Sequence, residues 1–293
     1  MNKRIGTGAM AALWAALWAA TALGLAGAAG AAPPAAAPAA KTATGTYEQA
    51  LAAAQRGDIA TAVKIWQPLA DKGDARAQAN LGLLYVAGAG LPKDPAKGAE
   101  LLHKAADQGL VQAQFMLGVM LLNGEGLAKD PAQGVSWLRK AGDGGLAAAQ
   151  VDVGIAYQSG LGVAADPAQA AQWYAKAADQ NDIHAEVGLA DLYHKGEGVA
   201  RDDDKAFALY KKAADVHYGV AEYDLARMYK DGAGVAADPV QAYVLFGLAS
   251  MHPDRDHPGV VNLAGAAQQA LGSTMSAEQL DKAKALFGIL SER

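Results

Sequence analysis

Apolar residues along the chain follow the spacing of a helix face, and the same pattern returns in five consecutive segments. In the first segment Ala77, Leu81, Leu84 and Tyr85 fall at i, i+4, i+7 and i+8, positions that share one face of an α-helix. The second of these positions recurs every 36 residues, as Leu81, Leu117, Val153, Leu189 and Leu225. A unit of this length cannot bury its apolar face alone, so the copies are predicted to stack on one another.

A glycine pair, Gly-x-Gly, follows each apolar stretch. The first glycines of these pairs are Gly88, Gly124, Gly160, Gly196 and Gly232. Because glycine takes positive φ without a steric penalty, each is predicted to end a helix. The pair Asp94-Pro95 then predicts the start of a second helix, since aspartate caps free N–H groups and proline fits the first turn. In the fourth copy Asp202 keeps this cap without the proline. Each unit is therefore predicted to be a helical hairpin.

Composition narrows the kind of core that such hairpins can build. Hydrophobic residues make up 52% of the chain and aromatic residues only 6%, so the core is expected to consist mainly of alanine and leucine. Stacked hairpins need no central core, so the 293 residues are predicted to form one continuous array rather than the two domains that the length alone would suggest. The fold class is predicted to be all-α, with no sheet.

The first 31 residues have the pattern of a secretory signal peptide. Lys3 and Arg4 precede an apolar stretch over residues 9–25, and small residues follow it. Cleavage is expected within residues 28–31, and the alanine- and proline-rich residues 32–46 are predicted to form a linker. The chain is then periplasmic or secreted. The alternative is an uncleaved segment that anchors the chain to the inner membrane, because the apolar stretch and the small residues after it are nearly long enough to span a bilayer.

Charge and cysteine content exclude several classes of partner and site. The formal net charge is −5, and acidic and basic residues are interspersed along the chain, so nucleic acid is not an expected partner. The chain has no cysteine, which excludes disulfides and thiolate metal sites.

The repeat unit resembles a known family. The pattern Ala77-x-x-x-Leu81-Gly82-x-x-Tyr85-x-x-Gly88-x-Gly90, followed by Asp94 and by Lys104-Ala105-Ala106-x-x-Gly109, is similar to the Sel1-like repeat, a relative of the tetratricopeptide repeat. The C-terminal segment looks like the tail of secreted bacterial members. The resemblance implies a right-handed α-solenoid that acts as an adaptor or scaffold for other proteins, and it implies no reaction.

The resemblance also divides the chain into segments. Residues 47–73 are predicted to form a shorter capping hairpin of the tetratricopeptide type, which lacks the Gly-x-Gly sequence. Residues 74–252 hold five repeats of 36 residues, and residues 253–293 are predicted to form C-terminal capping helices. Ser276 with Gln279 forms a capping-box pattern before the last of these helices.

In tetratricopeptide units the first helix of each hairpin lines the concave surface, and the same alignment predicts a partner-binding groove here. The candidate groove residues are Phe115, Val119, Leu122, Val151, Ile155, Gln158, Asp191, His194, Tyr223 and Arg227. The groove would be apolar in its middle and polar at its far end. Two interpretations of the apolar part stay open: it is an exposed interaction surface, or neighbouring repeats or the C-terminal helix cover it and its residues belong to the core.

No catalytic residue, cofactor or metal is predicted. The Gly-x-Gly turns lack both a preceding strand and the third glycine of a dinucleotide loop, and no Gly-x-Ser-x-Gly sequence is present. His184, Asp191 and His194 share a helix face, but the two histidines are ten residues apart, or about 15 Å along the axis, so they are not expected to share a metal.

The sequence therefore predicts an exported, non-enzymatic scaffold that holds a protein or peptide partner in its groove. The alternative is an envelope protein that binds, or weakly hydrolyses, cell-wall or β-lactam-like material. A partner is expected to be a protein or peptide, with contact to the membrane only through an uncleaved N-terminal segment.

Overall fold

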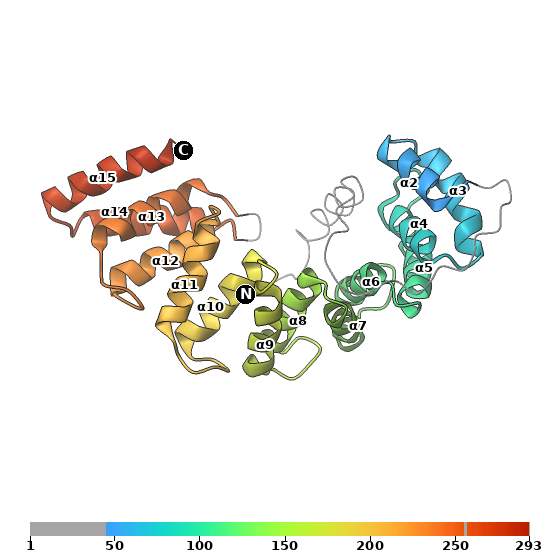
Figure 1. The fold of residues 1–293 in the computed structure, drawn as a ribbon, viewed down its shortest axis with the longest axis horizontal. Coiled ribbons are helices and arrows are strands. Elements are labelled where there is room, and N and C mark those ends of the chain that lie inside the picture. Colours follow the sequence, from blue (N-terminus) through green and yellow to red (C-terminus); the bar gives the residue numbers. More distant parts are fainter. Residues whose placement is uncertain (1–44, 255–256, 293) are drawn as a thin grey trace. The chain divides into compact units, whose positions relative to one another are not determined.

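The computed structural model describes residues 45–254 and 257–292 (Figure 1). Within these ranges every regular element is an α-helix, and the 14 helices are labelled α2 to α15. The predicted signal peptide, residues 1–31, and nearly all of the predicted linker lie outside the described residues. In the described ranges no helix is both long and apolar enough to cross a bilayer.

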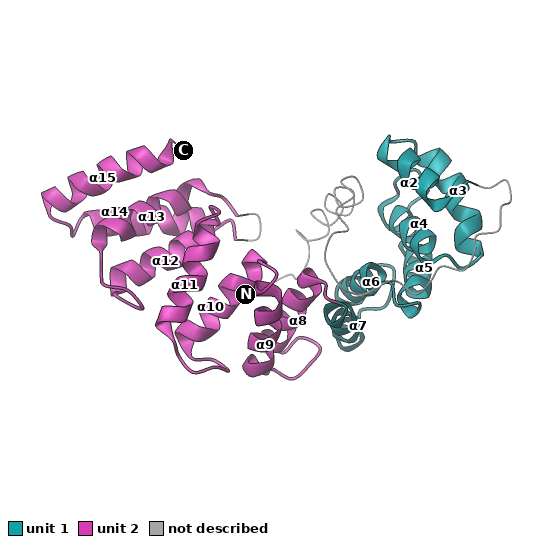
Figure 2. Cartoon of the chain, viewed as in Figure 1, with its two compact units in different colours: residues 1–144 teal, residues 145–293 magenta. Residues whose placement is uncertain are grey.

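The chain forms two compact units, and the first ends at Gly144 (Figure 2). Its helices are α2 (Tyr47–Gln55), α3 (Ile59–Asp71), α4 (Ala75–Ala87), α5 (Pro95–Asp107), α6 (Val111–Asn123) and α7 (Pro131–Asp143). Each helix packs against the next one along the chain. The unit is thus a stack of three helical hairpins, the first of which has the tight link and lacks the Gly-x-Gly turn, as the sequence predicts.

The second unit begins at Gly145. Its helices are α8 (Ala147–Ser159), α9 (Pro167–Ala178), α10 (Ile183–Lys195), α11 (Asp203–Ala214), α12 (Gly219–Asp231), α13 (Pro239–Met251), α14 (Val260–Gly272) and α15 (Ala277–Ser291). Consecutive helices from α8 to α14 pack on one another, and α15 packs on α13. The all-α stack of helical hairpins predicted from the sequence is confirmed.

The single continuous array expected from the repeat pattern remains a prediction, because the division into units describes compactness within each part of the chain. The division falls after the second repeat, in the turn that follows α7, which contains Gly144 and Gly145.

The helix ends follow the predicted turn chemistry. Gly88 ends α4 in the left-handed region at φ 72°, and the first glycine of each later pair ends its helix in the same way. Asp94 caps α5 by accepting from the Lys97 N–H at 3.0 Å. Asp202 caps α11 without a proline by accepting from the Lys205 N–H at 3.0 Å. Side-chain acceptors thus satisfy N–H groups that have no partner inside the helix.

The second glycine of the pair has a separate role, which is a close approach between repeats. A Cβ at Gly198 would lie 2.2 Å from the carbonyl carbon of Pro167, the first residue of α9 in the preceding repeat. A Cβ at Gly234 would lie 2.2 Å from the carbonyl oxygen of Asp203, and Gly126 stands in the same relation to Pro95. The turn of one repeat therefore packs on the first turn of the second helix of the repeat before it.

The last helix begins as predicted. Ser276 and Gln279 form a capping box, in which the serine Oγ accepts from the Gln279 N–H at 3.2 Å and the glutamine Oε1 accepts from the Ser276 N–H at 3.1 Å. The limits of the linker, the repeats and the two caps as functional segments remain predictions.

Candidate functional site

The apolar residues predicted for the groove are mostly buried. On α6, Phe115, Val119 and Leu122 are 1%, 2% and 5% exposed, and Val151 on α8 is 7% exposed. This burial favours the interpretation in which these four side chains belong to the core. The surface that a partner can reach then comes from the other predicted positions.

Ile155 and Gln158 on α8 are partly buried, and Gln158 is held by a tyrosine of the next helix. The Tyr174 hydroxyl on α9 donates to the Gln158 Oε1 at 3.0 Å. Its ring fills the space left by two glycines, because a Cβ at Gly154 or at Gly188 would lie 2.6 or 2.9 Å from ring atoms. Small residues on α8 and α10 therefore let a second-helix side chain reach the groove positions.

Tyr210 on α11, 36 residues after Tyr174, makes the corresponding contact in the next repeat. Its hydroxyl donates to the Asp191 Oδ1 on α10. The Lys195 Nζ lies 3.3 Å from the other oxygen of the same carboxylate. Asp191 is thus held by a hydroxyl and an ammonium group while its side chain stays 34% exposed.

A small pocket lies between these residues and α12. It is lined by His194, Tyr210, Asp224, Arg227, Met228, Asp231 and Ala233. The Arg227 Nη1 donates to the Asp224 Oδ1 at 3.1 Å. The His194 Nδ1 lies 2.7 Å from the Asp203 Oδ1 at the start of α11. The pocket therefore combines two carboxylates and a guanidinium from α12, an imidazole from α10 and a tyrosine hydroxyl from α11.

Tyr223 lies on the same helix as Arg227 but packs differently. Its ring lies 5.4 Å from the ring of Phe246 on α13, centroid to centroid. Because Phe246 is fully buried, this contact joins Tyr223 to the core of the last repeat.

The electrostatics of the pocket are set by burial. Burial, followed by repulsion from Asp191, raises the pKa of Asp224 to about 6, although Arg227 acts in the opposite direction. Burial, followed by the charge of Asp191, also raises the pKa of the Tyr210 hydroxyl, so it remains a hydrogen-bond donor at neutral pH. The charge of Asp224 raises the pKa of Arg227 despite its partial burial. The pocket thus holds one permanent cation beside a carboxylate that is costly to ionise.

The raised pKa of Asp224 predicts a pH-dependent stability. Folded Asp224 binds its proton more tightly than the unfolded chain, whose ordinary value is 3.8, so this stabilisation is complete below pH 3.8 and is lost as pH rises through about 6. We expect Asp224→Asn to raise the free energy of unfolding by about 1–3 kcal/mol at pH 8 and to change it little at pH 4. Urea unfolding at both pH values measures the difference, and Asp204→Asn on the exposed side of α11 is the control. Equal effects of Asp224→Asn at both pH values would contradict the assignment.

The residues considered for a metal do not come together. His184 faces the Tyr218 hydroxyl at 3.3 Å, Asp191 contacts Tyr210, and His194 contacts Asp203. These three side chains therefore belong to separate local pairs. A different group, formed by His217, Glu222 and His252 in the last repeat, does converge.

Sequence reasoning found part of this site and missed the rest. It placed Asp191, His194 and Arg227 on the first helices, and the structure brings His194 and Arg227 into one pocket that Asp191 borders through Tyr210. It missed Tyr210 and Asp224. The available signal was the 36-residue frame. Asp224 occupies the position that Gly188 holds one repeat earlier, and Tyr210 occupies the position of Tyr174.

Stacked helical hairpins, in which a Gly-x-Gly turn joins the two helices of each repeat, define an α-solenoid repeat protein. A model of the Sel1 repeat matches five successive segments, residues 75–110, 111–146, 147–182, 183–216 and 219–254. The matches cover more than half of the chain, and the protein belongs to the Sel1 repeat family. Proteins of this family are generally non-enzymatic scaffolds for protein interactions. No match to this sequence was found among the curated proteins.

Two solved structures illustrate the similarity. One is c5321, a protective antigen present in uropathogenic Escherichia coli strains that displays an SLR fold; it is 27% identical with a TM-score of 0.66. The match covers 82% of this chain and 64% of that one, so this chain spans less than two thirds of the length of that antigen. The other is a Sel1 repeat protein from Oxalobacter formigenes, 24% identical with a TM-score of 0.69, where the match covers 77% of this chain and 100% of that one. The second similarity concerns the fold alone.

Proposed function

We propose that this protein is an exported, non-enzymatic scaffold that binds a protein or peptide segment on the first helices of its second unit. The observation that carries the proposal is the pocket between α10, α11 and α12, because its charged residues are not required by the repeat. The first-helix position of Asp191 and Arg227 is apolar in the first three copies, as Leu83, Val119 and Ile155. The fold therefore tolerates apolar residues there, and the charged residues of the last two copies are available to bind a partner.

The charge of the pocket favours a basic side chain of the partner. Asp224 and Asp231 line it with the guanidinium of Arg227, and Asp191 adds a further carboxylate through Tyr210, while the exposed Lys195 and Lys230 pair with Asp191 and Asp231 at the rim. A lysine or arginine from the partner would offset the repulsion between Asp191 and Asp224 and the cost of ionising Asp224. Binding is then expected to strengthen as pH rises through about 6, which is the pKa of Asp224 in the folded protein without its partner.

Export is the part of the proposal that depends on sequence alone. Lys3, Arg4 and the apolar stretch over residues 9–25 support a periplasmic or secreted protein, with inner-membrane anchoring as the alternative. The proposal includes no cofactor, no nucleic acid and no catalytic residue.

Site-specific photocrosslinking in the cell that makes the protein tests the binding site. A crosslinking amino acid at Asp231, which is exposed and lines the pocket, is expected to capture one defined protein. The same amino acid at Ala208, exposed on α11, is the matched control and should not capture it. The isosteric changes Asp191→Asn and Asp224→Asn together should reduce the capture at least about tenfold, because they remove the charges that bind the partner's cation.

Two results would contradict the proposal. Equal capture from Asp231 and Ala208 would mean that the pocket does not direct the contact. Undiminished capture after both aspartates are neutralised would mean that a different surface binds the partner. Purification of the captured pair and measurement of its affinity at pH 5 and pH 7.5 then tests the expected increase with pH.

A further inference from the structure

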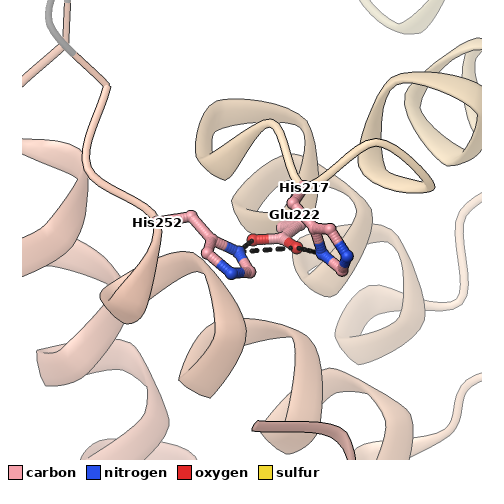
Figure 3. Close-up of side chains that lie close together, drawn as sticks. All are labelled: His217, Glu222 and His252. Carbon is pink, nitrogen blue, oxygen red and sulfur yellow. Dashed lines mark hydrogen bonds and ion pairs between the residues drawn. The ribbon is translucent and has the colours of Figure 1, made fainter. Parts of the chain in front are cut away.

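Two histidines and a buried glutamate converge in the last repeat (Figure 3). His217 lies in the link between α11 and α12, Glu222 in the first turn of α12, and His252 directly after α13. The His252 Nδ1 lies 2.8 Å from the Glu222 Oε2, and the His217 Nδ1 lies 3.5 Å from the Glu222 Oε1. Figure 3 shows both imidazole rings turned toward the carboxylate, and the centroids of the two rings lie 4.8 Å apart.

The same positions carry a neutral pair of glutamines in the first and third repeats. Gln78 and Gln108 are 30 residues apart, as are Glu222 and His252, and the Gln108 Nε2 donates to the Gln78 Oε1 at 2.8 Å. Gln150 and Gln180 form the equivalent bond at 2.8 Å in the third repeat. Two amides are therefore sufficient to join these positions. In the last repeat a carboxylate and an imidazole replace them.

The fourth repeat indicates what a buried glutamate needs at this position. Glu186 is 2% exposed, and the Lys212 Nζ lies 2.6 Å from its Oε1. An ammonium group thus compensates the buried charge. In the last repeat the position 36 residues after Lys212 holds Leu248, so no lysine is available there and Glu222 faces His217 and His252 instead.

Two backbone features bring His217 close to Glu222 and the start of α12 close to the end of α13. His217 adopts φ 62°, at the position where Gly109, Gly145 and Asn181 also have positive φ in earlier copies. Histidine is uncommon in this region, although less disfavoured than most side chains. Gly219, which replaces the alanine, valine or isoleucine of the other copies, permits α12 to begin against α13, since a Cβ there would lie 2.3 Å from the His252 carbonyl oxygen. The last repeat thus differs from the other copies at His217, Gly219 and His252, and it shares its buried glutamate with the fourth repeat alone.

We propose that His217, Glu222 and His252 bind a divalent transition metal, with Zn²⁺ as the best fit. Their ligand atoms all lie within 4.8 Å of one another. Zinc bonds of about 2.0–2.1 Å at tetrahedral angles place neighbouring ligand atoms about 3.3 Å apart, and the two N···O separations of 2.8 Å and 3.5 Å bracket this value. Two imidazoles and a carboxylate are a common zinc ligand set.

Access and charge are consistent with this site. The Glu222 side chain is 1% exposed and supplies a negative charge that neither imidazole offsets while it is neutral. His252 and His217 are 30% and 63% exposed, so an ion reaches the site from solvent and keeps a fourth position for water. The bound ion would join the α11–α12 link, α12 and the end of α13, and so fasten the last repeat. This inference is independent of the proposed partner-binding pocket.

Titration of the full chain with zinc chloride in metal-free buffer, followed by calorimetry, tests the site. We expect one Zn²⁺ per chain with a Kd in the micromolar range or below, and a rise in Tm of several degrees when zinc is in excess. The variant His217→Asn, Glu222→Gln and His252→Gln restores the residue types of the third and fourth repeats, so it should fold. It should bind zinc about 100-fold more weakly or worse, and zinc should no longer raise its Tm.

His103→Gln is the control, because His103 pairs with Asp107 on an exposed helix face far from the cluster in sequence. It should leave zinc binding unchanged. His252→Gln alone provides a second test that alters only one ligand, and it should also weaken binding by at least about tenfold. Zinc binding that the triple variant retains, or no binding by the unaltered chain at 100-fold molar excess, would overturn the assignment.

Discussion

Gly198→Ala is expected to lower the free energy of unfolding of the second unit by about 3 kcal/mol or more, through strain and overpacking together. Gly198 has φ 72°, where an alanine costs about 1–2 kcal/mol. Its new Cβ would also lie 2.2 Å from the Pro167 carbonyl carbon and 2.3 Å from the Ala168 nitrogen. These are backbone atoms of a helix start, so the clash cannot be relieved by rotating a side chain.

The control separates the two contributions. Gly145 has φ 89°, and a Cβ there would meet nothing within 4 Å, so Gly145→Ala carries the backbone strain without the clash. We expect it to cost about 1–2 kcal/mol. Guanidinium unfolding of the two variants, monitored by circular dichroism, gives the difference. Equal midpoints would mean that the turn of one repeat does not press on the repeat before it.

The fold was predictable because most of its determinants are local. A helix face, a left-handed glycine and an aspartate cap each depend on a few neighbouring residues. The positions of Leu81, Gly88 and Asp94 carry these three features, and they recur every 36 residues. The role of the second glycine was not predictable in the same way. The contact of Gly198 with Pro167 joins different repeats, so it becomes visible only once the stacking distance is known.

The candidate site was predictable only in part, for a related reason. Asp191 and Arg227 occupy one first-helix position, and the frame alone places them on the same side of the stack. Whether the side chains of the second helix reach that side depends on the space between first helices. Tyr174 reaches it because Gly154 and Gly188 leave room, and that space is a property of packing.

The burial of the apolar groove residues could not be decided from the sequence. A buried and an exposed apolar residue look the same in a periodic pattern, and Phe115 and Val119 satisfy both interpretations. The histidine cluster, in contrast, could have been found by aligning the copies. His217 and His252 stand at positions where no other copy carries a histidine, and Glu222 stands where the first three copies carry glutamine.

Phe246→Ala is the second change expected to have a large effect. Phe246 is 1% exposed, packs in a cluster with Ala226 and Ala242, and contacts the Tyr223 ring at a tilt of 57°. Truncation of a buried phenylalanine removes its burial and leaves a cavity, which costs about 3–5 kcal/mol. The loss should appear as a lower unfolding midpoint of the second unit.

Leu263→Ala on α14 is the matched control for burial, since Leu263 is also a large apolar residue but is 57% exposed. We expect it to change the free energy of unfolding by less than about 1 kcal/mol. If the two variants destabilise equally, α14 packs more tightly on the last repeat than the exposure of Leu263 indicates. If only Phe246→Ala destabilises, the aromatic cluster of Tyr223 and Phe246 is the contact that closes the stack at its C-terminal end. In that case Tyr223 belongs to the core rather than to the partner-binding surface, and the surface of the second unit is defined by Asp191, His194 and Arg227.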